Sequence, residues 1–180
     1  MQGLFVDTPE TLRCKLLTRA LVAHGAPVAI AGPAGSGKSS CAAQVALSLD
    51  SDAFITHSLT FNALTTVAQT QEIISESLHR RGKGVLGPER GKTAVFVIDD
   101  LHAPAADASG TQRSQELLRS HLCHGGWCDD PALELHGSHV RHDDLLVINT
   151  DNLAPSSYIA EGHGLRVRRN LMRKLVVNLL

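Results

Sequence analysis

The chain has 180 residues, 43% of them hydrophobic, and a net charge of −1, which suits one domain with a substantial buried core. This charge provides no basic field for nucleic acid or anionic membrane, no apolar run approaches the roughly 20 residues of a membrane span, and the N-terminus lacks a signal-peptide profile. Four cysteines in a chain of this length indicate a reduced, intracellular setting rather than a disulfide framework.

The first predicted element is a helix that begins near Asp7 or Thr8 and ends at Gly25. One of the first two residues would cap the helix, and Pro9 would occupy its first turn. Apolar residues at helical spacing predict one apolar face. These residues are Leu12, Leu16, Leu17, Ala20 and Leu21. Residues 1–25 are therefore expected to lead into a main unit of residues 26–180.

A phosphate-binding loop is predicted next. The apolar run at residues 27–31 predicts a buried strand, residues 32–39 match the template G-x-x-x-x-G-K-[ST], and residues 40–49 predict a helix. In this context, backbone N–H groups converge on an anion at a helix N-terminus. The predicted binding residues are Gly32, Pro33, Ala34, Gly35, Ser36, Gly37, Lys38, Ser39 and Ser40. Lys38 would reach the β- and γ-phosphates and the Ser39 hydroxyl would coordinate Mg²⁺. The alternative interpretation is an ordinary glycine-rich turn.

Residues 53–92 predict secondary structure rather than binding or catalytic residues. Residues 53–55 are a short strand candidate, followed by a polar segment at residues 57–62 and a helix at residues 65–78. Two basic segments, at residues 80–84 and 87–92, have the composition of solvated surface loops. This region is therefore expected to supply one strand, one helix and exposed loops.

A second phosphate-site motif follows. Residues 94–98 form the strongest strand signal and end in Asp99 and Asp100. An apolar strand that ends in an acidic pair, after a phosphate loop, is the Walker B pattern. Asp99 is the predicted Mg²⁺-linked carboxylate, and Asp100 the general base for a hydrolytic water. Because Asp100 is one methylene shorter than the Glu usual in such ATPases, we expect slow or regulatory hydrolysis.

The last predicted elements complete an α/β pattern. Residues 112–122 predict a helix, residues 145–148 a strand that ends at Asn149, and residues 165–180 a helix. Asn149 would act as a sensor of the γ-phosphate, and ordinary turn chemistry is the alternative. Alternating strands and helices predict a doubly wound parallel sheet flanked by helices, with the ligand at the carboxyl ends of the strands.

Histidine and cysteine are dense in one region of the chain. These residues are His121, Cys123, His124, Cys128, His136, His139 and His142. They could hold zinc, but their spacing matches no standard zinc finger, so a histidine-rich polar loop is the favoured interpretation. Cys41, close to the phosphate loop, is interpreted as a small packing residue.

Segments around both phosphate motifs carry a family resemblance. They are VDT at residues 6–8, GPAGSGKS at 32–39, TFNALTT at 60–66, RRGKGVLGP at 80–88, VFVIDDLHAP at 95–104, GTQ at 110–112, ELLR at 116–119 and GWCD at 126–129. In this order they resemble one AAA+ module of a dynein heavy chain, and most closely the third module of axonemal-type chains.

The resemblance implies a P-loop NTPase fold, the AAA+ large subdomain, without the small helical lid. It implies binding of ATP with Mg²⁺ and a contribution to a microtubule minus-end-directed motor. Implied partners are neighbouring AAA+ modules of the same chain, dynein intermediate and light chains, and microtubules. The implied location is the cytoplasm and cytoskeleton, in a cilium or flagellum axoneme, with no nucleic acid or membrane partner.

The chain also departs from the family pattern. His102 and Ala103 replace Asn-Met after the acidic pair, and the G-P-P-G-G-G-R stretch is degraded at residues 150–164. An ungapped match puts Asn170 at the position of the family's arginine finger, with Arg169 beside it. The chain is expected to be a fragment of a longer one. Alternatives are a structural module that holds nucleotide without hydrolysis, a non-motor AAA+ ATPase and a gene remnant.

Overall fold

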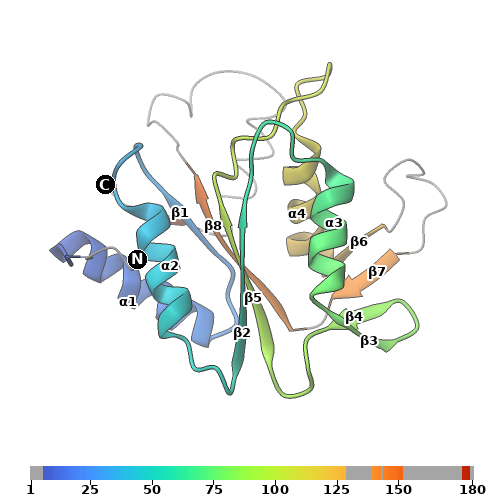
Figure 1. The fold of residues 1–180 in the computed structure, drawn as a ribbon, viewed down its shortest axis with the longest axis horizontal. Helices are drawn as coiled ribbons and strands as arrows, with labels where there is room; N and C mark the ends of the chain where they lie inside the picture. The colour runs from blue at the N-terminus through green and yellow to red at the C-terminus, as the bar shows by residue number, and fades with distance from the viewer. Residues whose placement is uncertain (1–5, 129–138, 143, 152–175, 179–180) are drawn as a thin grey trace.

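A computed structural model describes residues 6–128, 139–142, 144–151 and 176–178 (Figure 1). Its main sheet has the strand order β2-β5-β8-β1-β9, with every neighbouring pair parallel. These strands are β1 (Val28–Ala31), β2 (Phe54–Thr60), β5 (Thr93–Asp99), β8 (Leu145–Asp151) and β9 (Val176–Asn178). The expected parallel α/β sheet is confirmed, and the carboxyl ends of its strands lie at one edge.

Helices cover both faces of this sheet. They are α1 (Pro9–Ala23), α2 (Lys38–Ser48), α3 (Val67–Glu76) and α4 (Arg113–His124). Helices α1 and α2 lie on one face and α3 and α4 on the other (Figure 1). Successive side chains of β5 point to opposite faces of the sheet, so Val97 packs toward α2 while Phe96 and Ile98 pack toward α3 and α4. This explains why β5 reads as a continuous apolar run.

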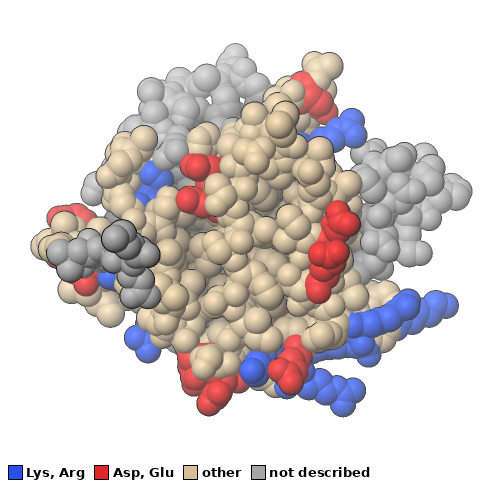
Figure 2. Space-filling view, viewed as in Figure 1, with Lys and Arg blue, Asp and Glu red and all other residues tan. Residues whose placement is uncertain are grey.

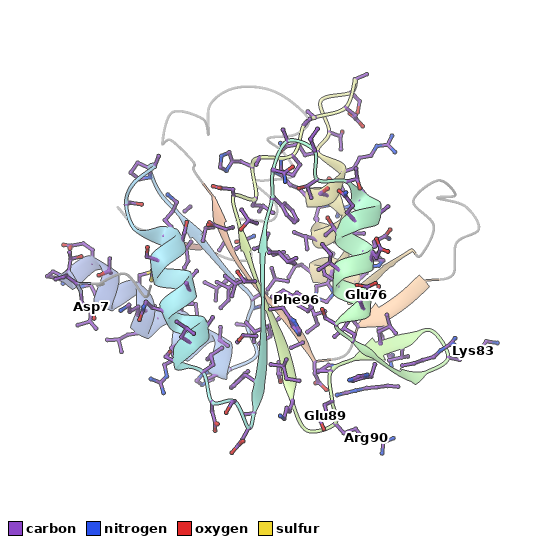
Figure 3. All side chains as sticks on the ribbon, in the orientation of Figure 1. Asp7, Glu76, Lys83, Glu89, Arg90 and Phe96 are labelled. Atoms are coloured by element: carbon purple, nitrogen blue, oxygen red, sulfur yellow. The ribbon has the colours of Figure 1, made fainter. Side chains whose placement is uncertain are left out.

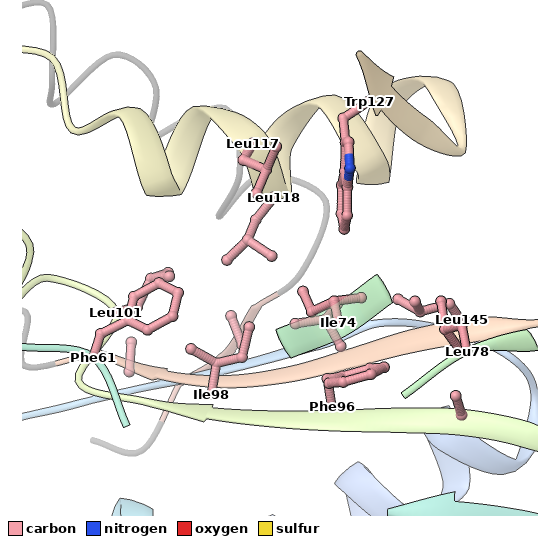
Figure 4. Close-up of a cluster of buried hydrophobic side chains, with 14 residues drawn as sticks. Phe61, Ile74, Leu78, Phe96, Ile98, Leu101, Leu117, Leu118, Trp127 and Leu145 are labelled. Atoms are coloured by element: carbon pink, nitrogen blue, oxygen red, sulfur yellow. The ribbon is translucent and has the colours of Figure 1, made fainter. Parts of the chain in front are cut away.

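The larger core lies between the sheet and α3 and α4 (Figure 4). Phe96, Ile98 and Leu118 are each at most 1% exposed, and Trp127 is 2% exposed. Helix α3 begins at a capping box, in which the Thr66 hydroxyl accepts from the backbone N–H of Gln69 at 3.2 Å. This cap holds α3 in position for Ile74, which is fully buried.

Helix α1 buries a different face from the one predicted. Thr8 caps the helix and Gly25, at φ +73°, follows its end, as expected. However, Leu12, Leu16 and Leu17 are 47%, 62% and 54% exposed. The buried residues are Thr11, Cys14, Thr18 and Val22. These side chains are smaller than leucine and allow α1 to approach α2 closely, so the leucine face turns outward.

The first of the two basic segments predicted to be loops, residues 80–84, forms part of a small second sheet, whereas residues 88–92 of the second segment form a loop as predicted. The strands of this sheet are β3 (His79–Gly82), β4 (Val85–Gly87), β6 (Gly126–Cys128) and β7 (His139–His142), in the order β3-β4-β7-β6. Strands β3 and β4 form an antiparallel hairpin with Lys83 at its tip, and basic side chains project there (Figures 2 and 3). For residues 80–82 the loop prediction was wrong because mostly exposed charged residues carry no apolar alternation.

Other expectations also need correction. Strand β2 runs through the segment predicted to be polar, because an edge strand with one exposed face alternates polar and apolar residues. The predicted helix at residues 165–180 is wrong at Val176–Asn178, which pair with β1 as β9, and its remainder lies outside the described residues. Within the described part of the chain, no helix is long and apolar enough to cross a membrane.

Candidate nucleotide-binding site

The glycine-rich loop lies between β1 and α2, at the carboxyl edge of the sheet (Figure 1). Gly35 and Gly37 have φ values of +79° and +82°, the left-handed region that favours glycine. Gly37 is the N-cap of α2 and provides no side-chain hydrogen bond to the helix. The N–H groups of the first turn therefore face the loop concavity, where the helix dipole favours an anion.

Lys38 is folded over this loop. Its residue is only 5% exposed, and Nζ donates to the Pro33 carbonyl oxygen at 2.6 Å and to Ser36 Oγ at 3.4 Å. Ser36 Oγ donates to the same Pro33 carbonyl at 2.9 Å. The ammonium group is thus held at the concavity lined by backbone N–H groups, where it can bind phosphate oxygens.

Ser39 and Asp99, which are far apart in the sequence, are in direct contact. Ser39 Oγ donates to Asp99 Oδ1 at 2.8 Å, which joins the first turn of α2 to the end of β5. Hydroxyl and carboxylate oxygens are the hard ligands that Mg²⁺ prefers, so the donor set fits this ion. The residues predicted to bind the metal are therefore brought together.

Thr150 is a site residue that the sequence did not single out. Its hydroxyl donates to the same Asp99 Oδ1 and accepts the backbone N–H of Asp100 at 3.3 Å. Register explains the contact: Val97 pairs with Ile148, so two residues later Asp99 and Thr150 share one face of the sheet. Only the pairing of β5 with β8 carries this signal, and that pairing is not visible in the sequence.

Asp100 follows β5 in an unusual backbone conformation. Its φ is +53°, left-handed for a residue that is not glycine, and its N–H also donates to Asp99 Oδ1 at 3.1 Å. Its carbonyl oxygen accepts the N–H of Ala103 at 2.9 Å, which closes a tight turn. These bonds hold the backbone of the predicted general base beside Asp99.

Asn149 lies inside β8 rather than at the end of a strand, so the predicted position was wrong. The strand continues to Asp151 because Thr150 still pairs with β1. By alternation, the Asn149 side chain faces α3 and α4, away from Asp99 and Ser39. It is 1% exposed, and among the described residues its Oδ1 has no hydrogen-bond partner. Its role as a sensor remains a prediction.

Two residues of the histidine-rich region, His121 and His142, pack with Trp127 at the other end of the sheet. The His121 ring lies 5.5 Å from the His142 ring and 6.1 Å from the Trp127 ring, measured between centroids. Burial lowers the pKa of His121 because the charged form loses hydration. No group of three or more potential metal ligands occurs among the described residues. His136 lies outside them, as do Arg169 and Asn170.

Together the glycine loop, Lys38, Ser39 and the carboxylate at the end of β5 in the same parallel sheet define a class of protein: a P-loop NTPase. Residues 1–141 match the family described as the P-loop containing dynein motor region. The chain therefore belongs to the dynein heavy chain motor family, and the expected AAA+ P-loop fold is confirmed.

Known relatives agree with this assignment. The chain is 40% identical over 127 residues to dynein axonemal heavy chain 1 of Rattus norvegicus, covering 71% of this chain and 3% of the relative. It is 39% identical over 126 residues to dynein axonemal heavy chain 3 of Homo sapiens, covering 70% and 3%. It is 34% identical over 135 residues to dynein axonemal heavy chain 9 of Homo sapiens, covering 75% and 3%. The chain thus spans about 3% of the length of these relatives.

Proposed function

We propose that this chain is an ATP- and Mg²⁺-binding AAA+ module of a dynein heavy chain, with slow or regulatory hydrolysis. Residues 26–180 would form the nucleotide-binding subdomain, and residues 1–25 would lead into it. The observation that carries the proposal is the 2.8 Å contact between Ser39 and Asp99, because it joins the two phosphate-site motifs in one place. In our proposal, this module is most similar to the third AAA+ module of axonemal dynein heavy chains.

The chain's own groups would bind and orient the nucleotide. The loop of residues 32–37 and the first-turn N–H groups of α2 would cradle the phosphates, together with Ser40. The Lys38 ammonium would move from the Pro33 carbonyl to the β- and γ-phosphates. Ser39 and Asp99 would hold Mg²⁺, which when bound neutralises phosphate charge. Catalysis in this class depends on positioning and electrostatics.

Asp100 would accept the proton of the attacking water. The Asn149 side chain faces α3 and α4, so the proposed sensor role would require it to turn toward the phosphates. The backbone N–H of Asp100 donates to Asp99 Oδ1 and Thr150 Oγ1, which fixes the turn that carries the proposed base. A second candidate function is a structural module that binds nucleotide without turnover. The shorter Asp100 side chain favours that candidate, because misplacement of about 1 Å can cost about a hundredfold in rate.

The wider role is proposed from the family. The module would contribute to microtubule minus-end-directed movement as part of a ring with neighbouring AAA+ modules. Dynein intermediate and light chains and microtubules would be partners of the whole heavy chain. The location would be the cytoskeleton in the cytoplasm, within the axoneme of a cilium or flagellum, in keeping with the axonemal names of the relatives.

Titration of a fluorescent ATP analogue with Mg²⁺ tests the proposed binding. In the 180-residue chain, Lys38→Ala is expected to weaken binding about 10- to 100-fold, because a hydrogen bond to a charged group contributes about 1.5–3 kcal/mol. The matched control is Lys83→Ala, at the exposed hairpin tip (Figure 3), which should bind normally. Equal affinity of the native chain and Lys38→Ala, both folded, would contradict the proposal.

A further inference from the structure

Strand β2 forms one edge of the main sheet. It stands first in the order β2-β5-β8-β1-β9, and within the described residues β5 is the only strand that pairs with it. Edge strands are templates for pairing with another chain, and proteins usually block them with lysine, proline or a bulge. The sequence of β2, FITHSLT, contains neither lysine nor proline, and its register with β5 runs without a shift. The edge therefore lacks these protections.

The backbone bonds between β2 and β5 show which groups of β2 point outward. The N–H of Thr93 donates to the Ala53 carbonyl at 2.9 Å, and the N–H of Phe61 donates to the Asp99 carbonyl at 3.0 Å. In a parallel ladder a strand bonds to one neighbour through alternate residues, so the odd-numbered residues from 53 to 61 face β5. The even-numbered residues direct their N–H and C=O groups away from β5. Those that are exposed are Thr56, Ser58 and Thr60.

A groove adjoins this edge on the side of α3. Its volume is about 290 Å³, and it lies between the carboxyl end of β2 and α3. Thr60 lines the groove, so the groove is continuous with the outward-facing backbone. Phe61, which is 4% exposed, and Ile73, which is 43% exposed, provide apolar lining from opposite sides. The groove can therefore accept an aliphatic side chain from a strand added to β2.

The α3 side of the groove is acidic. Glu72 lines the groove and Glu76 follows one helical turn later, and both residues are exposed. Among the described residues neither of them forms an ion pair. Figure 2 shows a surface without charged residues over most of β2 and acidic side chains beside it on α3, where Figure 3 labels Glu76. Like charges one turn apart repel, so a cationic partner would relieve this repulsion.

We propose that β2 and α3 form a docking site for an extended segment of a second protein, in which an apolar side chain is flanked by Lys or Arg. The segment pairs as an added strand with the outward-facing backbone of Thr56, Ser58 and Thr60. Its apolar side chain enters the groove, and its cationic side chains lie beside Glu72 and Glu76. Strands β5 and β8 separate this edge from β1 and the glycine loop, so the site is distinct from the proposed nucleotide site.

Fluorescence anisotropy of labelled heptapeptides with the 180-residue chain tests the site. In the probe TKTLTKT, both lysines and the leucine point to the same side of an extended strand. We expect this probe to bind. Binding should be about tenfold weaker for TETLTET, whose glutamates α3 repels, and for TKTATKT, which lacks the side chain for the groove. No binding of TKTLTKT, or equal binding of all three probes, would overturn the proposal.

Two N-methylated forms of TKTLTKT test whether the backbone of the peptide pairs with β2. Successive N–H groups of a strand point to opposite edges. Methylation of the threonine nitrogens therefore blocks one edge of the peptide, and methylation of the lysine and leucine nitrogens blocks the other. One form should lose binding and the other should keep it. Equal affinity of the two forms would contradict strand addition.

Ser58→Pro blocks the edge from the side of the protein. The substitution removes an N–H that points away from β5, so the bonds between β2 and β5 remain. With its fold checked by circular dichroism, this variant should bind TKTLTKT about tenfold more weakly, because an added strand loses a hydrogen bond and meets the proline ring. Its binding of an ATP analogue should stay normal, so this proposal and the proposed function can fail independently.

A second variant tests the charge of the site without a change to the backbone. Glu72→Gln combined with Glu76→Gln should weaken binding of TKTLTKT about three- to tenfold at low salt, and less at high salt. The matched control is Glu10→Gln, at an exposed position of α1 on the other side of the sheet, which should bind normally. Unchanged binding by the double variant would overturn the proposal. A dimer of the native chain that Ser58→Pro abolishes would assign the edge to a second copy and would also overturn it.

Discussion

Asp99 is the residue on which the candidate site converges. Its Oδ1 accepts hydrogen bonds from the hydroxyls of Ser39 and Thr150 and from the backbone N–H of Asp100. Three donors on one oxygen hold the carboxylate in a single orientation. Sequence reasoning found Asp99 and Ser39 through local motifs. It missed Thr150 because that contact depends on which strands are neighbours, a long-range property that no local pattern carries.

Replacement of Asp99 by Asn should remove the benefit of Mg²⁺ for nucleotide binding. The amide keeps the shape of the side chain but loses the negative charge that the ion requires. We expect binding by Asp99→Asn in Mg²⁺ to fall to the level that the native chain shows in EDTA. The control is Asp52→Asn, at an exposed turn before β2. A Mg²⁺ response in Asp99→Asn equal to that of the native chain would contradict the assignment.

Asp100→Glu should increase the single-turnover rate of ATP hydrolysis, by up to about 100-fold. The added methylene moves the carboxylate by about 1 Å toward a water placed for Glu, and errors of that size cost about this much in rate. Asp100→Asn, which removes the base, should lower any turnover that the native chain shows. A rate unchanged by Asp100→Glu would indicate that the structure already compensates for the short side chain, or that the module does not hydrolyse ATP.

At the scale of elements, helix α1 shows the limit of apolar periodicity. Its leucines recur at helical spacing, yet the face that packs on α2 carries Thr11, Cys14 and Thr18 instead. Close approach of two helices favours small side chains, and this requirement overrides hydrophobicity as a guide to the buried face. The helix itself was predictable because its cap and its end depend on local residues, Thr8 and Gly25.

Two substitutions on α1 test which face is buried. Val22→Ala should lower the free energy of unfolding by about 1–3 kcal/mol, because Val22 is 1% exposed and its loss leaves a cavity. Leu16→Glu should change it by less than about 0.5 kcal/mol, because Leu16 is 62% exposed. Chemical denaturation of both variants measures the difference. A larger loss for Leu16→Glu than for Val22→Ala would restore the predicted face.

On the scale of the whole molecule, the parallel sheet was predictable because its central strands are continuous apolar runs. The small second sheet was not, since its strands are short and β3 is mostly exposed. This sheet meets α4 at the cluster of His121, Trp127 and His142, beyond the amino end of β8. Packing of polar aromatic rings in this cluster depends on tertiary structure, so the sequence suggested only a polar loop.

Global stability should fall in mild acid because of His121. Burial lowers the pKa of His121 in the folded chain below the ordinary 6.5. The contribution of His121 to the free energy of unfolding is therefore fully present above about pH 6.5 and is lost as the pH falls below that value. One proton changes stability by at most about 1.4 kcal/mol per pH unit. Denaturant unfolding at pH 7.5 and 5.5 measures the loss. His121→Gln should show a smaller loss than the native chain; an equal loss would assign the effect to other groups, such as His57, whose pKa burial also lowers.

The strand order has a consequence for how the site is made during protein synthesis. Strand β8 lies between β1 and β5, although it leaves the ribosome after both. Strands β1, before the glycine loop, and β5, which carries Asp99, therefore do not pair directly. They reach their final separation only when β8 is inserted between them. A nascent chain that stops short of residue 145 would contain both phosphate motifs in full and still be unable to assemble them, so nucleotide capture would be among the last events of its folding.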